Sequence, residues 1–219
     1  PWTAGENLSR LGTNGTLDPV AAIAQQHVNL FNSPGHRQNM LNGNYRELGV
    51  AQRIGPFTAN GTVFTSTSMV TENFARSGPA VFVTGVAYDD SNDNLFYDRH
   101  EGVAGVGVAA AGVGATATAA AGGYALAIPG GTGSGPVTVT LTFGARVQTL
   151  AVDVSAGNVK LDVTADGLIA VSGAATLMGG AATAMLLGVG GGLVGNSAPN
   201  GLTGTRGADR IEGGGGNDT

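Results

Sequence analysis

The last segment of the chain, residues 195–219, repeats with a period of nine, and this repeat limits the available folds more than any other feature. A unit of nine residues can form only a short strand and a turn, and it cannot bury its own apolar side chain. Such units become stable when neighbouring units stack in parallel, so the repeat predicts the start of a parallel β-roll. The columns that coincide are Gly195, Gly204 and Gly213, then Asn200, Asp209 and Asp218, then Leu202 and Ile211.

Each column has a physical role in such a roll. The glycines permit turns with positive φ, and the apolar residue fills the narrow core. The carboxylates of stacked turns, here Asp209 and Asp218, can bind calcium together with backbone carbonyl groups. The first turn carries Asn200 in place of an aspartate, with Pro199 beside it. The alternative interpretation is a flexible tail rich in Gly and Asp.

The nonapeptide pattern resembles that of the hemolysin-type, repeat-in-toxin proteins, and the resemblance covers residues 195–219 only. It implies export of a bacterial protein by a type I system, an extracellular location and folding on contact with extracellular calcium. It also implies further repeats beyond Thr219. The sequence contains no Cys, which fits this interpretation because calcium would then take the stabilising role of disulfides.

A second pattern of calcium ligands lies at residues 90–101. Five of the chain's 15 acidic residues occur between Asp89 and Glu101, and such crowding is repulsive unless a cation neutralises it. The spacing is that of a twelve-residue calcium loop, with Leu95 at the position where such loops have glycine. A plain turn rich in Asp and Asn is the alternative. The predicted ligands are Asp90, Asn92, Asn94, the carbonyl group of Phe96, Asp98 and Glu101.

Residues 80–165 contain six or seven short runs of β-forming residues, separated by clusters of Gly, Pro and Ser. This spacing predicts a small all-β sandwich in which the calcium loop joins two strands. The stretch 85–106 resembles the calcium-binding B-type repeats of bacterial surface adhesins. The stretch 122–129 is similar to the carboxypeptidase-regulatory, transthyretin-like sandwich. Both resemblances imply an immunoglobulin-like or prealbumin-like spacer without catalysis.

Residues 167–205 carry no charged side chain, and the stretch 168–194 is apolar enough to suggest a membrane-spanning helix. Its many glycines argue against a helix, because each interior glycine costs roughly 1 kcal/mol relative to alanine. No Lys or Arg flanks the stretch to anchor it in a bilayer. We therefore expect residues 166–194 to form a Gly-rich linker or short strands, without a transmembrane span.

Residues 1–77 have the ordinary chemistry of helices and strands. Asp18 followed by Pro19 predicts a helix N-terminus, and apolar residues then recur at helical spacing as far as Phe31. The dipeptide Asn60-Gly61 predicts a turn between two strands. Four segments in the same order resemble the bacterial branch of the CAP superfamily (cysteine-rich secretory proteins, antigen 5 and pathogenesis-related proteins): residues 5–8, 30–41, 45–50 and 69–75.

The CAP resemblance implies the C-terminal part of an α-β-α sandwich whose cleft binds a divalent metal through two His and two Glu. Glu6 matches the Glu of the family's G-E-N segment, and His36 is a residue that bacterial members place in the cleft. The first His of the tetrad would precede Pro1, the second Glu aligns with about Ser33, and the second His aligns near Met69. Only one tetrad member is therefore matched.

Glu6 and His36 are the candidate catalytic residues, because a carboxylate and an imidazole within reach can ligate a cation or exchange a proton. That chemistry would make the N-terminal region a cell-wall or peptide hydrolase. The alternatives are structural: His36 would form a hydrogen bond that positions the loop after Gly35, and Glu6 would cap backbone amides near Asn7. The incomplete tetrad argues against an enzyme.

Composition excludes several other functions. The sequence has 10 Lys and Arg against 15 Asp and Glu, which argues against a nucleic-acid partner. It contains no Cys, which excludes thiol catalysis and Cys-ligated zinc. It contains neither a phosphate-binding G-x-x-x-x-G-K-[ST] motif nor an H-E-x-x-H zinc motif.

Together these observations predict a multidomain chain. We expect a partial CAP-type α+β fold over residues 1–77, an all-β sandwich over 80–165, the uncharged segment over 166–194 and the start of a parallel β-roll over 195–219. The expected function is that of a secreted, calcium-binding protein with an extracellular or cell-surface partner. A hydrolase that uses the CAP cleft and an adhesin-type structural protein are the alternatives.

Overall fold

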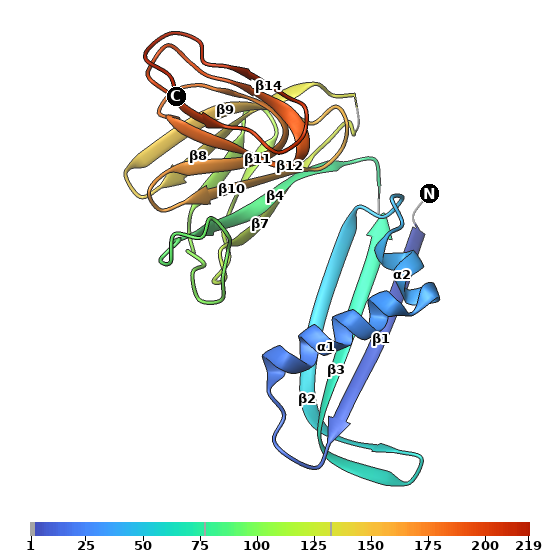
Figure 1. Cartoon of the computed structure of the whole chain (residues 1–219). Helices are drawn as coiled ribbons and strands as arrows, with labels where there is room; N and C mark the ends of the chain where they lie inside the picture. The colour runs from blue at the N-terminus through green and yellow to red at the C-terminus, as the bar shows by residue number, and fades with distance from the viewer. Residues whose placement is uncertain (1–2, 77, 132) are drawn as a thin grey trace. The chain divides into compact units, whose positions relative to one another are not determined.

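The computed structural model describes residues 3–76, 78–131 and 133–219, and it divides into two compact units, residues 1–78 and 79–219. The first unit is drawn in blue to green and the second in green to red in Figure 1. The elements are β1 (Thr3–Thr13), α1 (Pro19–Asn32), α2 (Pro34–Met40), β2 (Glu47–Ala59), β3 (Thr62–Arg76), β4 (Val81–Tyr88), β5 (Gly107–Ala110), β6 (Gly114–Ala117), β7 (Gly123–Ile128), β8 (Pro136–Phe143), β9 (Arg146–Asp153), β10 (Val159–Thr164), β11 (Leu168–Leu177), β12 (Thr183–Val194), β13 (Gly201–Thr203) and β14 (Asp209–Glu212).

The N-terminal unit is a three-stranded antiparallel sheet with α1 and α2 on one face (Figure 1). The strand order is β1-β3-β2, so β3 is central. The α1 helix begins as predicted, because the Asp18 carboxylate accepts hydrogen bonds from the backbone amides of Val20 and Ala21 and Pro19 occupies the first turn. The helix buries Ala22, Gln26 and Leu30, which recur every four residues on one face.

The predicted turn between β2 and β3 is confirmed. Ala59 pairs with Thr62, and the two residues between them both have positive φ, 49° at Asn60 and 77° at Gly61. This is the backbone conformation that two-residue hairpin turns require and that Asn-Gly supplies at little cost.

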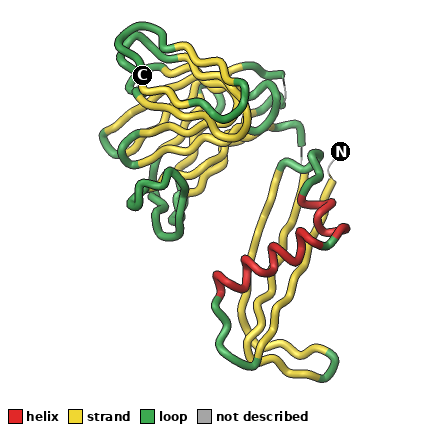
Figure 2. The backbone as a smooth tube through the Cα atoms, in the orientation of Figure 1, coloured by secondary structure: helices red, strands yellow, loops and turns green. Residues whose placement is uncertain are grey.

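The C-terminal unit forms one sheet of eleven strands, and its described residues contain no helix (Figure 2). The main path of the sheet runs β6-β5-β8-β9-β11-β10-β4-β7. The sheet is nearly closed, since its two end strands, β6 and β7, lie near each other. Buried side chains from β4 to β12, for example Val83, Leu141, Leu161, Ile169 and Leu193, pack in one hydrophobic cluster.

The remaining strands add to this sheet by parallel pairing. β12 runs parallel to β11 on one side, and it pairs in parallel with both β13 and β14 on the other. The β11–β12 register shifts between Ser172 and Gly173, so the first and second parts of β12 pair in separate stretches. The part of the chain without charges is therefore built into the sheet as strands.

The predicted fold class is wrong. The chain is mostly β, with 53% of its residues in strands and 10% in two helices among the described residues, and it is not a multidomain α+β fold of the CAP type. In the described N-terminal unit, α1 and α2 cover one face of a three-stranded antiparallel sheet.

The other two parts of that prediction do not form separate units. The strands of residues 80–165 do not close into a separate immunoglobulin-like or prealbumin-like sandwich, because β9 and β10 continue the sheet through β11. Residues 195–219, expected as the start of a β-roll, supply β13 and β14 to the same sheet. One shared core holds these parts together, since Ile169 of β11 and Leu193 of β12 are fully buried in it.

Candidate functional site

The predicted calcium loop lies between β4 and β5, and backbone pairing closes its base. The amide of Asp89 donates to the carbonyl of Glu101 at 2.8 Å, and Tyr88 forms an antiparallel bridge with Gly102. The Tyr97 ring meets the Tyr88 ring edge-on, with the ring centroids 6.0 Å apart. The loop that carries the predicted ligands is therefore anchored to β4 at both of its ends.

Asp90, at the first ligand position, organises the reversal of the chain. Its two carboxylate oxygens accept hydrogen bonds from the backbone amides of Asn94, at 3.1 Å, and Leu95, at 2.9 Å. Leu95 has φ of 60°, so the sharp turn forms without the glycine that such loops usually place there. Asp93 and His100 also have positive φ, 56° and 79°. Left-handed conformations are uncommon for residues other than glycine, and three in one loop indicate that side-chain contacts hold its shape.

The middle ligand positions converge on Asp98. The amide groups of Asn92 and Asn94 both donate to Oδ2 of Asp98, at 2.9 and 2.7 Å. These two hydrogen bonds lower the pKa of Asp98 from its ordinary value of 3.8. The amide of Phe96 donates to Oδ1 of Asn94 at 2.7 Å. Counted from Asp90 as position 1, the residues at positions 3, 5, 7 and 9 are thus linked to one another: Asn92, Asn94, Phe96 and Asp98.

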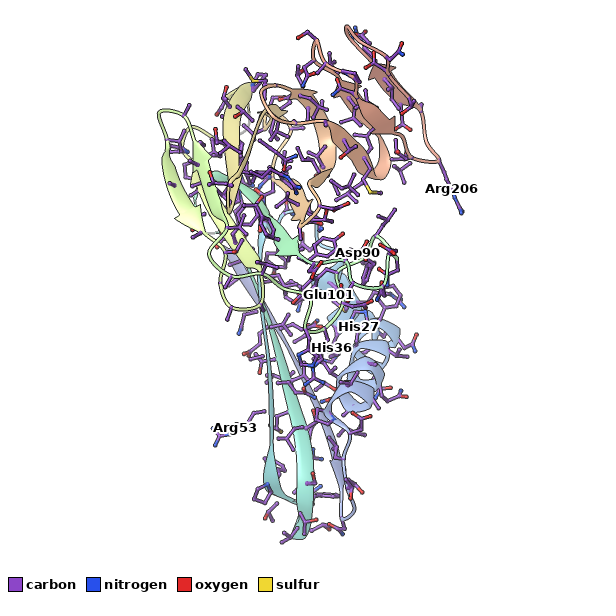
Figure 3. All side chains as sticks on the ribbon, turned by 90° about the vertical axis from the view of Figure 1, so that its left-hand side faces the viewer. His27, His36, Arg53, Asp90, Glu101 and Arg206 are labelled. Atoms are coloured by element: carbon purple, nitrogen blue, oxygen red, sulfur yellow. The ribbon has the colours of Figure 1, made fainter. Side chains whose placement is uncertain are left out.

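Glu101, at the last ligand position, is buried inside the loop and is only 7% exposed. Its Oε2 accepts a hydrogen bond from the Asp98 amide at 2.8 Å, and its Oε1 accepts one from the Ser91 hydroxyl at 3.2 Å. Figure 3 shows Asp90 and Glu101 in the same loop. A buried carboxylate with two donors keeps the loop's end close to its start.

An acidic cavity of about 240 Å³ lies against this loop. Four carboxylates line it, those of Asp89, Asp90, Asp93 and Asp166, together with Thr164, Leu95 and Leu168. Burial and then the charges of Asp90, Glu101 and Asp166 raise the pKa of Tyr88. Sequence reasoning missed Asp166, because it comes from the distant β10–β11 turn; only the Asp-Gly dipeptide there signals a turn.

The donor set of the loop suits a hard cation. It consists of carboxylate, amide and backbone carbonyl oxygens only, which is the chemistry that calcium prefers. Among the described residues, no three His, Asp or Glu side chains gather closely enough to hold a metal by themselves. A cation in the loop would therefore depend on Asn92, Asn94 and the Phe96 carbonyl as well as on the carboxylates.

The nonapeptide turns repeat in three dimensions as they do in sequence. Gly195, Gly204 and Gly213 each lie against the side chain five residues further on, so closely that a Cβ would clash with it; these side chains are Asn200, Asp209 and Asp218 respectively. In two of the turns the backbone amide after the glycine donates to that same side chain: Asn196 to Asn200 at 2.8 Å, and Thr205 to Asp209 at 2.6 Å. Glycine is thus needed here for close approach.

Successive windings stack with an offset of 18 residues. Thr183 pairs with Gly201 and Gly191 pairs with Asp209, a separation of 18 in each case. The backbone amide of Asn200 also donates to Oδ1 of Asp218, which is 18 residues away, at 2.9 Å. Two nonapeptides therefore make one winding. The sixth residues of the nonapeptides, Asn200, Asp209 and Asp218, form what we call the sixth column, and Asn200 and Asp218 of this column are hydrogen-bonded between successive windings.

Asn200 is the exception among these side chains. It is 3% exposed, and its Nδ2 donates to the carbonyl oxygens of Ala181, at 3.4 Å, and Ala182, at 3.2 Å, one winding earlier. An amide nitrogen here meets carbonyl oxygens that a cation could otherwise bind. Asp209 has no such amide; its carboxylate accepts hydrogen bonds from the amide and hydroxyl of Thr205.

The two candidate catalytic residues are not brought together. Glu6 and Asn7 are consecutive on β1 and point to opposite faces of the sheet. The Asn7 side chain donates to the His36 carbonyl at 3.1 Å, so Asn7 faces α2 and Glu6 faces away from it. The opposite face also carries Arg53, which projects away from the helices in Figure 3. Within the described residues no hydrogen bond or ion pair joins Glu6 to His36; the His36 ring contacts the Ser33 hydroxyl at 2.8 Å.

Comparisons with known proteins add no further assignment. No protein-family model matches the chain, and neither the curated proteins nor the solved structures gave a match. None of the described helices is both long enough and apolar enough to cross a membrane.

Proposed function

We propose that this chain binds calcium, with the loop of residues 90–101 as its principal site. The observation that carries the proposal is the convergence of the loop's ligand positions. Hydrogen bonds link Asp90, Asn94, Asp98 and Glu101 around a chain reversal at Leu95. A twelve-residue spacing alone is a sequence pattern, whereas this convergence brings the oxygen-bearing side chains to one place.

The residues that would hold the ion are those at the ligand positions, namely Asp90, Asn92, Asn94, the Phe96 carbonyl, Asp98 and Glu101. Bound calcium would neutralise the carboxylates and link β4 to the segment before β5. Asp90 and Glu101 fix the two ends of the loop, and the two asparagines supply neutral oxygens that add no repulsion. The neighbouring acidic cavity strengthens the attraction for a cation at long range.

The nonapeptide turns are the second part of the proposal. Asp209 and Asp218 are the acids of the sixth column, and each lies over a glycine that leaves room for it. We assign weaker sites to these turns, because the described part of the chain offers one carboxylate per turn and the turn of Asn200 offers none. Sites with few charges bind calcium in the range suited to extracellular modules, which agrees with an extracellular location.

Calorimetric titration with calcium tests the principal site. Asp90→Asn should weaken the tightest binding step at least about tenfold, since hydrogen bonds and contacts of charged groups are worth roughly 1.5–3 kcal/mol. The matched control is Asp93→Asn, which removes the same charge from the same loop at a position that is not a ligand. It should change the affinity by no more than about threefold.

The outcomes separate the two kinds of site. The proposal for the loop is contradicted if the wild-type chain takes up no calcium, or if Asp90→Asn and Asp93→Asn have equal effects. Asp218→Asn should leave the tightest step unchanged and weaken a later one. If it removes the tightest step instead, the turns and not the loop are the principal site.

A further inference from the structure

The N-terminal unit contains an apolar cavity of about 450 Å³ that the calcium proposal does not involve. It lies between α1, α2 and the face of β2 and β3 that the helices cover, and its walls include Ile23, Val50 and Val70. The volume falls within the range of small-molecule sites, which are mostly apolar with a few placed polar groups. Two polar residues line this cavity, Glu72 and His27, and its described lining contains no Arg or Lys.

The Glu72 carboxylate is fixed from behind by a chain of hydrogen bonds. Glu72 lies on the central strand and is 7% exposed. Its Oε2 accepts a hydrogen bond at 3.0 Å from Nδ2 of Asn7, which is fully buried. The oxygen of that Asn7 amide accepts in turn from Nδ2 of Asn39, at 3.0 Å. The two asparagines therefore set both the position and the orientation of the carboxylate.

The second carboxylate oxygen has spare acceptor capacity toward the cavity. Nδ1 of His27 lies 3.9 Å from this oxygen, Oε1, which is beyond hydrogen-bond distance. The His27 side chain is 60% exposed, so its imidazole is largely solvated at the cavity's edge. Burying a carboxylate among apolar groups raises the free energy of the folded chain unless hydrogen-bond donors satisfy its oxygens. Here Oε2 has the Asn7 donor, whereas Oε1, among the described residues, has only the distant His27 ring.

From this arrangement we infer that the cavity binds a small amphiphilic cation, an alkyl or aryl amine whose ammonium group pairs with Glu72. Charge complementarity favours this occupant, because a negative group in the wall of an apolar cavity selects a positive group on an apolar body. The ammonium donates to Oε1 of Glu72, and its second donor reaches the His27 imidazole. The hydrocarbon part lies against Ile23, Val50 and Val70. An anion or a neutral chain of the same length leaves the carboxylate repelled or unpaired.

A ligand series tests the inference on the full chain, with and without a calcium chelator. The probes are n-octylammonium, n-octanoate and octan-1-ol, which share one hydrocarbon chain, and binding is followed by calorimetry and by backbone amide shifts. Octylammonium should bind at least about tenfold more tightly than either of the others. Glu72→Gln, which keeps an acceptor for Asn7, should abolish that preference. Equal affinity for the three probes, or an unchanged preference in Glu72→Gln, overturns the inference.

A matched pair of variants tests the location. Val50 lines the cavity and is 53% exposed, whereas Val63, on the same sheet, is 57% exposed and lies outside the cavity lining. Val50→Trp should fill the cavity and weaken octylammonium binding at least about tenfold, while Val63→Trp should leave it unchanged. If both variants weaken binding equally, or if neither does, the cation does not occupy this cavity.

Discussion

The loop of residues 90–101 and the nonapeptide turns of residues 195–219 hold their acidic side chains by opposite means. In the turns a glycine lies under each side chain of the sixth column, and its missing Cβ leaves room for that side chain. In the loop, residues other than glycine adopt left-handed conformations, and hydrogen bonds to Asp90, Asp98 and Glu101 maintain them. The turns therefore depend on glycine at the point of close approach, whereas the loop has no glycine at its reversal, depends on hydrogen bonds to its charged groups and should respond more strongly to calcium.

The largest effect is expected where the winding meets the core. Leu193 of β12 is completely buried, so Leu193→Ala should lower the free energy of unfolding by about 2–5 kcal/mol, with or without calcium. The control is Val189→Ala on the same strand, where the side chain is 89% exposed and the change should stay within about 0.5 kcal/mol. Chemical denaturation measures both. A small effect of Leu193→Ala would show that the winding is not held by packing.

The next largest effect is expected at Asn200, the one residue of the sixth column that is not an aspartate. Asn200→Asp replaces an amide that faces the carbonyl oxygens of Ala181 and Ala182 with a buried charge that they repel. Without calcium the unfolding free energy should fall by roughly 1–3 kcal/mol, and millimolar calcium should restore most of it. Asn217→Asp is the exposed control. Stability that is equal with and without calcium would contradict the view that the amide takes the place of a cation.

A smaller effect tests the strain at the chain reversal. Leu95 has φ of 60°, a conformation that glycine adopts freely, and its side chain is 54% exposed. Leu95→Gly should therefore be neutral or stabilising by up to about 1 kcal/mol, in contrast to the usual cost of adding glycine. Gly204→Ala, in the turns, should destabilise, because its Cβ would meet Oδ2 of Asp209 at 2.7 Å. Thermal unfolding measures both variants. If both substitutions destabilise the chain, or both stabilise it, the contrast between the loop and the turns is contradicted.

The smallest effect is a dependence on pH. The pKa of Asp98 is lowered in the folded chain by the Asn92 and Asn94 amides. The stabilisation that these bonds give is fully present above the ordinary pKa of 3.8, and it is lost as pH falls through the lowered value. In Asn92→Ala/Asn94→Ala the Asp98 pKa should return toward 3.8, measured by NMR titration of its carboxyl carbon. An unchanged pKa would show that the two amides do not hold this carboxylate.

Local sequence signals predicted much of the secondary structure. Asp18 before Pro19 marked the start of α1, and Asn60-Gly61 marked the β2–β3 turn, because both depend on neighbouring residues only. The β-forming run from Val81 to Tyr88 corresponds to β4. Pairing between distant strands left no such signal. The nonapeptide repeat indicated parallel stacking for residues 195–219, but the pairing of β11 with β12 and the joining of all these strands into one sheet could not be deduced from local patterns.

In the candidate sites, too, the features set by neighbouring residues could be predicted, and those set by distant residues could not. The ligand spacing of residues 90–101 could be read from the sequence, because all its members lie within one loop. Asp166 approaches that loop through the pairing of β10 with β4, and Asn7 lies directly opposite Glu72 on the neighbouring strand. The alternation of β1 directs Glu6 to the face opposite α2, which the matched segments of the sequence did not indicate.

Terbium luminescence tests the calcium loop most directly. Terbium takes oxygen ligands as calcium does, and Tyr97 within the loop can sensitise its emission when excited. We predict a saturable emission that calcium displaces, that falls at least about tenfold in Glu101→Gln and persists in Asp93→Asn. Tyr97→Phe should reduce the emission without preventing calcium uptake. No emission from the wild-type chain, or equal emission from Glu101→Gln, would contradict a calcium site in this loop.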